Sequence, residues 1–449
     1  MLRYVCRLAG FSEYMRWSFL SFCLLLPLSA KACPDLSAYY LYGDDPESQA
    51  ALEAALAPLM GECLRSSEFF ALYGASQMQS GKLAEALEML ERALLLDAGN
   101  GAAQIDYAQA LYLRGQLFSA LDLNEQIQQR DDIPSNIQTM LEQRERQWRR
   151  QTRDIAVVAD VLGGYDDNLN GAPDPSQITL TLSGEPVILT LNPEYQPISG
   201  PYLNLRLGGQ FRQLGADHQH NVSADLRGRA SEDTGSDLAQ FETRYQYTRT
   251  GRQQAWHVGG AASHLFFGGS ALYTAVEANG SYQRNLGERC TQRVDLASQY
   301  QLYRNQSNLN SIETKAGAGL DCPLPLAGKP GLFSLDLSLL NNAALNAGRP
   351  GGDRDGWQLD VNWQTPVFRG VLSAQVNHTE LRDSKGYSSL LDNGARRWLK
   401  RSYALLQYRQ LIRPDMAFLA NFYHQNQNSN IELFDSVDST VEIGISIRF

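Results

Sequence analysis

The chain has 449 residues, of which 43% are hydrophobic and 20% are charged, and its net charge at pH 7 is −10. This length is enough for two or three domains, and the acidic balance argues against a general nucleic-acid-binding protein. Mean hydropathy is −0.34. After residue 32 no apolar run reaches the roughly 18 residues that a membrane-spanning helix needs.

The N-terminus predicts a removable export signal at residues 1–32. Basic residues precede the apolar stretch FLSFCLLLPLSA, and a cleavage site of the A-x-A type ends at Ala32. Met15 is an alternative start, because the more compact signal begins there. Cleavage makes Cys33 the first residue of the mature chain, so a lipid-anchored cysteine is an alternative to a free N-terminus.

Four cysteines follow the signal, namely Cys33, Cys63, Cys290 and Cys322. An even number in an exported chain predicts two disulfides, and proximity along the sequence pairs Cys33 with Cys63 and Cys290 with Cys322. Four free thiols are the alternative, which an oxidising compartment disfavours. No CxxC or His-x-Cys spacing is present, so we expect no metal site and no cofactor.

A helical repeat domain is predicted at residues 67–150, preceded by an N-terminal helical cap at 33–66. Within it, residues 67–134 repeat with a period of 34. Tyr73, Gly74, Gly81, Leu83 and Ala86 recur as Tyr107, Ala108, Gly115, Leu117 and Ala120. Small residues let paired helices approach closely, and the pattern resembles the tetratricopeptide repeat. Asn124 departs from it, because a large apolar residue is usual at that position.

In such repeats the first helix of each pair lines a concave groove. This predicts a peptide-binding surface for a client protein, formed by Met78, Ile105, Gln109 and Tyr112. The alternative is that these side chains only pack between helices.

Residues 151–449 predict a different fold, a fourteen-stranded antiparallel transmembrane β-barrel. Apolar and polar residues alternate with a period of two in fourteen segments. The segments centre near residues 159, 207, 225, 244, 260, 278, 297, 316, 336, 360, 375, 404, 421 and 443. Soluble β-sandwiches also alternate, but short turns on one side and longer loops on the other favour an outer-membrane barrel. The complete fold class is therefore α + β, a helical domain followed by the barrel.

The polar faces of these segments carry many charged residues, which suits a hydrated lumen. The predicted lumen set is Arg206, Arg212, Arg227, Arg229, Glu242, Arg244, Arg293 and Asp295. Two interpretations stay open for it, the wall of a transport route and an internal salt-bridge network that holds the barrel together.

The C-terminal segment TVEIGISIRF ends on an aromatic residue, with apolar residues at every second position before it. Ile443, Ile445, Ile447 and Phe449 resemble the signal by which barrel-assembly machinery recognises its substrates. We therefore expect that machinery and outer-membrane lipid as partners, and no nucleic acid.

The stretch GYDDNLNGAP follows the first predicted strand. Its motif residues are Gly164, Tyr165, Asp166, Asn168, Asn170, Ala172 and Pro173. Together with the helical domain and the barrel, it resembles the surface lipoprotein assembly modulator (Slam) family, also called type XI secretion outer-membrane proteins. The resemblance implies an outer-membrane protein of a Gram-negative bacterium. It would deliver a surface lipoprotein or a soluble exoprotein to the cell surface, with its helical domain in the periplasm.

Several alternatives remain at this stage. An exopolysaccharide export barrel with a tetratricopeptide scaffold is the main rival function. The apolar-rich first loop, residues 166–200, departs from the family and could be a plug, a lid or a partner site. The start of GYDDNLNGAP also mimics a calcium loop, but Gln177 stands where a bidentate Glu is required, so Asn and Asp turns explain it better. No catalytic arrangement stands out, and we expect no enzyme activity.

Overall fold

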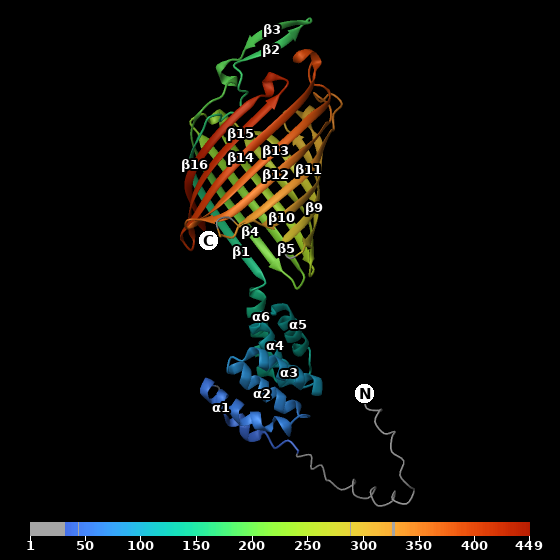
Figure 1. The fold of residues 1–449 in the computed structure, drawn as a ribbon, viewed down its shortest axis with the longest axis vertical. Helices are drawn as coiled ribbons and strands as arrows, with labels where there is room; N and C mark the ends of the chain where they lie inside the picture. Colours follow the sequence, from blue (N-terminus) through green and yellow to red (C-terminus); the bar gives the residue numbers. More distant parts are fainter. Residues whose placement is uncertain (1–31, 44, 288, 326–327) are drawn as a thin grey trace, which may run out of the picture. The chain divides into compact units, whose positions relative to one another are not determined.

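The computed structural model describes residues 32–449 except for residues 44, 288 and 326–327. Apart from Ala32, the predicted export signal lies outside the described residues. The chain divides into two compact units, Met1–Arg149 and Arg150–Phe449. The first unit is helical and the second is built from strands (Figure 1). The fold class predicted from the sequence is therefore confirmed.

The described part of the first unit begins with the short 3₁₀ segment Ser37–Leu41 and has a second one at Ala57–Gly61. The helices are α1 (Pro46–Leu56), α2 (Ser67–Gln79), α3 (Leu83–Leu96), α4 (Gly101–Leu113), α5 (Leu117–Gln128) and α6 (Ser135–Arg150). Both repeats are helix pairs, α2 with α3 and α4 with α5. Gly81 and Gly115 link them at φ of 80° and 82°, where other residues are strained. No helix in the described residues is long and apolar enough to span a membrane.

Small residues permit the close approach of the paired helices. A Cβ atom at Gly74 of α2 would lie 2.7 Å from Cγ of Leu90 in α3, so the site admits no side chain. Ala86, Ala108 and Ala120 are fully buried. The recurring small positions are therefore where the helices touch.

Asn124, the residue that departs from the repeat pattern, is fully buried and anchors α6. Its Oδ1 accepts hydrogen bonds from Nε and Nη2 of Arg144, at 2.9 and 2.7 Å. Its Nδ2 donates to the carbonyl oxygen of Leu141 at 3.2 Å. A buried polar side chain is tolerated when it is fully hydrogen-bonded, and here the bonds attach the last helix to the second repeat.

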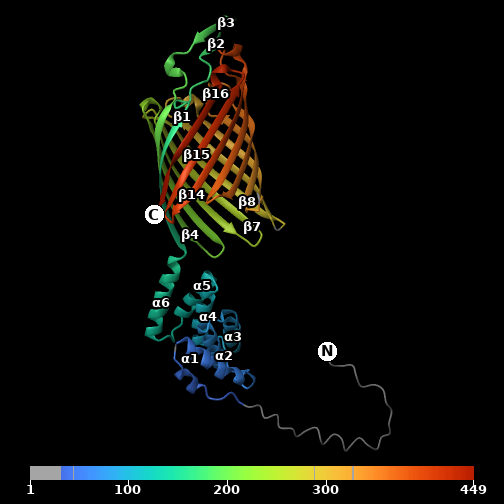
Figure 2. The same ribbon diagram turned by 60° about the vertical axis from the view of Figure 1, so that its left-hand side comes forward.

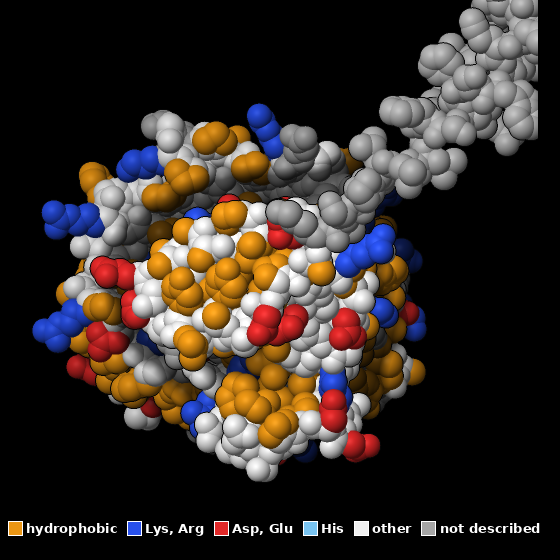
Figure 3. All heavy atoms as spheres, turned by 90° about the horizontal axis from the view of Figure 1, so that it is seen from below, with side chains coloured by type: hydrophobic (Ala, Val, Ile, Leu, Met, Phe, Trp, Pro, Cys, Tyr) orange, Lys and Arg blue, Asp and Glu red, His pale blue; other side chains and the backbone are white. Residues whose placement is uncertain are grey.

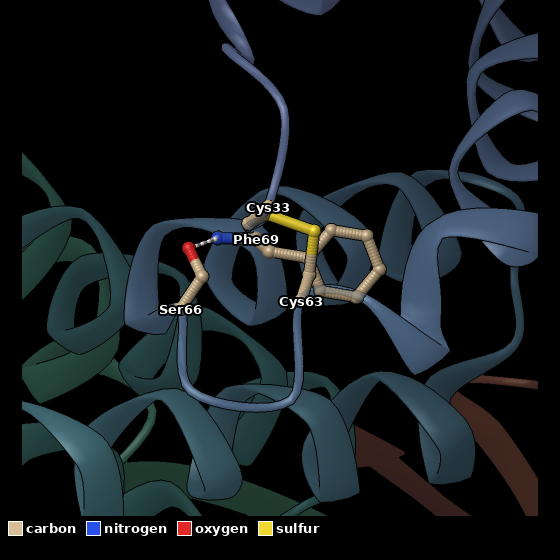
Figure 4. Close-up of a disulfide and its surroundings, with 4 residues drawn as sticks. All are labelled: Cys33, Cys63, Ser66 and Phe69. Atoms are coloured by element: carbon tan, nitrogen blue, oxygen red, sulfur yellow. Dashed lines mark hydrogen bonds between the residues drawn. A yellow bond between two sulfur atoms is a disulfide. The ribbon is translucent and has the colours of Figure 1, made fainter. Parts of the chain in front are cut away.

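The first disulfide, between Cys33 and Cys63, closes the N-terminal part of this unit, with Cα atoms 4.5 Å apart. Figure 4 shows it beside the ring of Phe69, where Ser66 Oγ accepts a hydrogen bond from the Phe69 N–H at the start of α2. The second bond joins Cys290 to Cys322, with Cα atoms 4.4 Å apart. Both pairs are those predicted from proximity along the sequence.

The second unit is a closed antiparallel barrel of fourteen strands in the described residues. They are β1 (Arg153–Asp166), β4 (Gly200–Leu214), β5 (His218–Ser231), β6 (Leu238–Thr250), β7 (Gln254–Phe267), β8 (Ser270–Leu286), β9 (Cys290–Tyr303), β10 (Ser311–Pro323), β11 (Leu332–Ala344), β12 (Arg354–Val367), β13 (Gly370–Gly386), β14 (Arg396–Arg413), β15 (Met416–Ser429) and β16 (Ser436–Arg448). The barrel closes where β1 pairs with β16. Each of the fourteen predicted centres lies within one of these strands.

The barrel has two different ends (Figures 1 and 2). We call the end with connections such as 215–217, 251–253 and 414–415 the turn end. The loop end carries the connections 167–199, 232–237, 345–353, 387–395 and 430–435. The first of these loops contains a hairpin of two strands, β2 (Gln177–Leu182) and β3 (Glu185–Thr190), which the sequence analysis did not predict.

The outer surface of the barrel is apolar. On β4, Leu203, Leu205 and Leu207 are 45%, 48% and 52% exposed, while the residues between them are less exposed. On β16, Val441 and Ile443 are 54% and 59% exposed. A lipid environment requires two things of a barrel. Its outer side chains must be apolar where they contact lipid, and its sheet must be closed so that every backbone hydrogen bond is satisfied internally.

Candidate functional site

The barrel wall that faces inward is lined by ion pairs. Arg206 of β4 lies between two carboxylates: its Nη1 is 3.4 Å from Oδ2 of Asp160, and its Nε donates to Oδ1 of Asp225. Arg229 Nη1 donates to Oδ2 of Asp166 at 2.9 Å. Strands alternate their faces, so inward-facing side chains of β1, β4 and β5 bring opposite charges together on one surface.

All eight residues of the predicted lumen set take part in ion pairs. Arg293 of β9 is the most heavily compensated, because its guanidinium faces Asp295 at 3.9 Å and Asp321 at 3.4 Å and also donates to Asp336. The other pairs are Arg212–Asp154 at 2.9 Å, Arg227–Asp225 at 4.0 Å and Arg244–Glu242 at 3.0 Å. This geometry favours a salt-bridge network in the wall, while the use of the lumen as a transport route stays a prediction.

A second cluster crosses the seam where the barrel closes. The carboxylate of Glu442 on β16 accepts hydrogen bonds from the Tyr202 hydroxyl at 2.8 Å and from Asn204 Nδ2 at 2.8 Å, both on β4. It also accepts one from Asn421 Nδ2 on β15, at 3.0 Å. Strand β1 lies between β4 and β16, and Gly164 is the β1 residue opposite both Tyr202 and Glu442.

Gly164 therefore has a defined role within the GYDDNLNGAP motif. A Cβ atom there would lie 2.6 Å from Cζ and 2.7 Å from the hydroxyl oxygen of Tyr202. The missing side chain leaves the space through which the Tyr202 ring reaches Glu442. The motif was identified by resemblance, but the three partners of Glu442 could not be found from sequence, because they depend on the strand register.

The two asparagines of the motif fold the first loop. Asn168 Nδ2 donates to the carbonyl oxygens of Ala172 and Val437, at 2.9 and 3.0 Å, and its Oδ1 accepts the Ala172 N–H at 2.8 Å. Asn170 Nδ2 donates to the Gln196 carbonyl at 2.9 Å, and its Oδ1 accepts the Ile198 N–H at 3.1 Å. These bonds tie both ends of the loop together and attach it to β16.

Three acidic side chains meet beside this motif, Asp166, Asp167 and Asp438, with oxygen atoms within 4.8 Å of one another. Both oxygens of Asp166 already accept hydrogen bonds, from the Asn168 N–H at 2.7 Å and from Arg229. Oδ1 of Asp167 accepts the Ser439 N–H at 2.6 Å. Hydrogen bonds within the chain thus occupy Asp166 and Asp167, as in Asn and Asp turns, and we assign no cation to the cluster.

The hairpin of the first loop lies at the rim of the barrel. Figures 1 and 2 show the hairpin β2–β3 beyond the ends of the barrel strands. The Thr181 N–H donates to the Leu390 carbonyl at 2.8 Å, so the hairpin rests on loop 387–395. Beneath the loop is a cavity of about 520 Å³ lined by residues that include Pro173, Tyr195 and Phe267. This placement does not fit the hairpin as a plug inside the lumen.

The four residues of the predicted groove in the helical unit, Met78, Ile105, Gln109 and Tyr112, are half-buried. Helix α6 engages two of them, because the Tyr112 ring stacks on Trp148 at 4.7 Å between centroids and the Ile105 carbonyl accepts from Arg144 at 3.1 Å. Met78 packs against the same apolar cluster. Packing between helices thus explains Ile105 and Tyr112, and Gln109 stays a candidate for client contact.

Apolar side chains are also exposed near the start of this unit, where Tyr40 and Leu41 are 57% and 86% exposed. Figure 3 shows hydrophobic side chains gathered in patches, with acidic side chains beside them, on the face that it views.

Asp106 of α4 makes the stability of the helical unit depend on pH. Burial raises the pKa of Asp106 to about 6, although the positive charge of Arg144 opposes the shift. The folded state therefore holds this proton more tightly than the unfolded state, so stability is lost as pH rises from about 4 through 6. We expect Asp106→Asn to stabilise the unit by up to about 3 kcal/mol at pH 8, and by much less at pH 4.

Thermal melting of the mature protein in detergent, followed by helical ellipticity at pH 4 and pH 8, measures this effect. Asp131→Asn, a change at an exposed position, is the control. An equal gain from Asp106→Asn at both pH values would show that the carboxylate is not the cause.

Comparison with known proteins gives a family match for part of the helical unit only. Residues 77–143 match the tetratricopeptide repeat model, and no curated protein matches the chain.

Solved outer-membrane proteins resemble the chain weakly. The outer membrane channel DcaP of Acinetobacter baumannii has a TM-score of 0.37 at 9% identity, covering 67% of this chain and 98% of that one. OccAB3 of Acinetobacter baumannii has 0.35 at 7%, covering 66% and 100%. A bacterial polysaccharide outer membrane secretin has 0.33 at 9%, covering 65% and 98%. Similarity at this level supports no functional conclusion.

The chain's own geometry defines its class. A closed barrel with a polar, ion-paired wall and an apolar outer belt is an outer-membrane β-barrel with a channel-like architecture. It is joined in one chain to a helical unit that contains tetratricopeptide repeats.

Proposed function

We propose that this protein is an outer-membrane secretion protein that delivers a specific client protein to the cell surface. The client is a surface lipoprotein or a soluble exoprotein, and the helical unit engages it before it crosses the membrane. The observation that carries the proposal is the union in one chain of a tetratricopeptide domain and a closed transmembrane barrel. A passive pore has no need of a helical repeat domain. The GYDDNLNGAP motif adds the resemblance to the Slam family.

The direction of the barrel supports a periplasmic helical unit. The chain enters the barrel at Arg153, which pairs with Gln213 next to the turn 215–217, so the helical unit is attached at the turn end. In bacterial outer-membrane barrels the short turns face the periplasm and the longer loops face the outside. The loop end, with its hairpin and the cavity beneath the first loop, would then be the extracellular side and a candidate partner site.

The size of the barrel supports passage of a chain rather than of a globular domain. Eight-stranded barrels are filled by side chains and barrels of sixteen to eighteen strands hold open channels, so fourteen strands lie between the two. A lumen of this kind with a charged wall could accommodate an extended polypeptide. A folded client would require a distorted barrel or a further component.

Deleting the gene should remove one specific protein from the cell surface and leave bulk surface polysaccharide unchanged. Protease shaving of intact cells, followed by mass spectrometry, measures the surface proteome. Complementation with Gln109→Lys should restore display less well than wild type if the groove binds the client. Gln79→Lys, at an exposed position of α2, should restore it fully.

Two results would contradict the proposal. An unchanged surface proteome after deletion would show that no surface protein depends on this protein for its delivery. A loss of surface polysaccharide with an intact surface proteome would favour polymer export instead.

A further inference from the structure

Three arginines meet around one carboxylate at the loop end of the barrel. Arg354 is the first residue of β12, Asp383 pairs with it on β13, and Arg397 lies near the start of β14. By strand alternation these three side chains face the lumen, because Trp357 and Trp398 belong to the opposite face, which is that of the 69% exposed Leu339 on β11. Arg349 joins them from the loop 345–353 between β11 and β12.

Asp383 is shared by two of the arginines. Its Oδ1 is 3.3 Å from Nε of Arg354, and its Oδ2 is 3.2 Å from Nε of Arg397. Arg349 differs, because among the described residues it forms no ion pair. Its Nη1 donates one long hydrogen bond, 3.5 Å, to the Asn342 carbonyl, and its Nε is buried without a hydrogen-bond partner in that part of the chain.

The charges of this cluster are unbalanced and out of water. Arg349, Asp383 and Arg397 are only 6%, 5% and 4% exposed. Asp353 also attracts Arg349, but its carboxylate is exposed and accepts the Ala344 N–H at 2.8 Å. Three guanidinium groups thus lie near one buried carboxylate, which forms ion pairs with two of them, Arg354 and Arg397.

At two other places in the wall, carboxylates outnumber the arginine that they surround. Arg206 faces two carboxylates, and Arg293 faces three. A buried excess of positive charge is unfavourable unless an anion compensates it.

The cluster is also held rigidly in place. Gly351 and Gly352 have φ of 78° and 68°, and these conformations let their loop lie against the end of β13. The Lys385 N–H donates to the Gly351 carbonyl at 2.9 Å, and the Ser384 N–H donates to the Asp353 carbonyl at 2.8 Å.

The Arg397 guanidinium is fixed separately. It packs against the rings of Tyr387 and Phe434, 4.4 and 4.3 Å from their centroids, and these two rings contact each other edge to face. Preorganised guanidinium groups lose little freedom when they bind a ligand.

We propose that Arg349, Arg354 and Arg397 form a lumen-facing binding site for a phosphate-type oxyanion. Guanidinium groups match the oxygens of phosphate in paired hydrogen bonds. A phosphate group carries enough charge to balance the two cations that Asp383 leaves uncompensated. Arg354 keeps 22% of its side chain exposed, so solvent reaches this member of the cluster. The oxyanion is either free phosphate or the phosphate of a lipid headgroup at the rim, and the site does not depend on the proposed secretion function.

Isothermal titration calorimetry of the mature protein in a phosphate-free, non-ionic detergent tests the site, with inorganic phosphate as the probe. We expect saturable binding that Arg349→Gln and Arg397→Gln each weaken at least about tenfold. Arg349→Lys should keep part of the affinity, because it retains the charge and loses the paired donors. Arg212→Gln is the matched control, since Arg212 also faces the lumen but has its own partner in Asp154, and it should bind as wild type does.

A second arm replaces inorganic phosphate with dihexanoyl phosphatidylglycerol below its micellar concentration. Binding of the phospholipid alone, lost in the same arginine variants, would identify a lipid headgroup as the source of the oxyanion. Heat-modifiable migration on gels shows whether each variant is folded. If Arg397→Gln does not fold, the substitutions at Arg349, which lies in a loop, still test the site. Absence of binding by both probes, or equal binding in wild type and Arg349→Gln, would overturn the proposal.

Discussion

Replacing Gly164 with alanine should sharply reduce the amount of closed barrel, whereas the same change at Gly163 should have little effect. The new methyl group would lie 2.6 Å from the Tyr202 ring, so the ring must leave its position. Overpacking costs about 1–3 kcal/mol, and the loss of a hydrogen bond to a charged acceptor adds about 1.5–3 kcal/mol. Gly163 has no atom within 4 Å of its Cβ position, which makes it a matched control.

The position of this clash explains the size of the expected effect. The seam pairs Val158–Asp166 of β1 with Thr440–Arg448 of β16, so the first five residues of β1 extend beyond its partner. Tyr202 of β4 reaches Glu442 of β16 by crossing β1 where Gly164 has no side chain, and Asn421 reaches Glu442 from the neighbouring strand β15. A residue that displaces Tyr202 therefore weakens the place where the first and last strands must join.

Refolding of the mature chain into detergent micelles, with the folded fraction read from heat-modifiable migration, measures the effect. Adding Tyr202→Ser to Gly164→Ala should recover part of the folded fraction. The serine relieves the clash, but it does not restore the packing of the tyrosine ring. A normal folded fraction for Gly164→Ala alone would mean that Tyr202 can move without consequence.

The strands and the helix pairs were predictable from the sequence because their signals are local. Alternation such as that of Leu203, Leu205 and Leu207 with polar residues follows directly from two environments on the two faces of one strand. Repeated small residues such as Gly74 and Ala108 likewise mark the close approach of neighbouring helices. Both patterns report the immediate surroundings of a segment and do not require its partner to be known.

The hairpin β2–β3 was missed although a signal for it exists. Polar and apolar residues alternate in TLTL before Ser183-Gly184, the β-branched and apolar run VIL follows, and the φ values of 51° and 85° at this pair are those of a tight hairpin turn. The segment could have been recognised by the alternation that identified the barrel strands.

The two most informative clusters could not have been predicted. Glu442 and Tyr202 are 240 residues apart, and they meet only because the barrel closes in one register. The arginine cluster likewise depends on the strand register, which decides which end residues of β12, β13 and β14 lie side by side at the rim. Sequence alone identified charged lumen positions, but it could not show which arginines have carboxylate partners and which do not.

Removing the Cys33–Cys63 disulfide should destabilise the helical unit by about 3–4 kcal/mol, because the bond closes a loop across 30 residues. The loop contains α1 and both 3₁₀ segments, and Cys63 is fully buried beside Phe69. In the Cys33→Ala/Cys63→Ala variant the melting temperature of the helical signal should fall by roughly 10–20 °C. The Cys290→Ala/Cys322→Ala variant should leave that melting unchanged, because its bond joins β9 to β10, which are already paired from Thr291 to Gln301.

The same bond decides between the two alternatives for the mature N-terminus. A sulfur atom that forms a disulfide cannot also carry the thioether of a lipid anchor, so the Cys33–Cys63 bond and a lipid-modified Cys33 exclude each other. Intact-mass measurement of protein extracted from membranes should find Cys33 without lipid and a mass increase of about 2 Da per bond on reduction. A diacylated Cys33, or helical melting that does not respond to reductant, would contradict the structural role given to this disulfide.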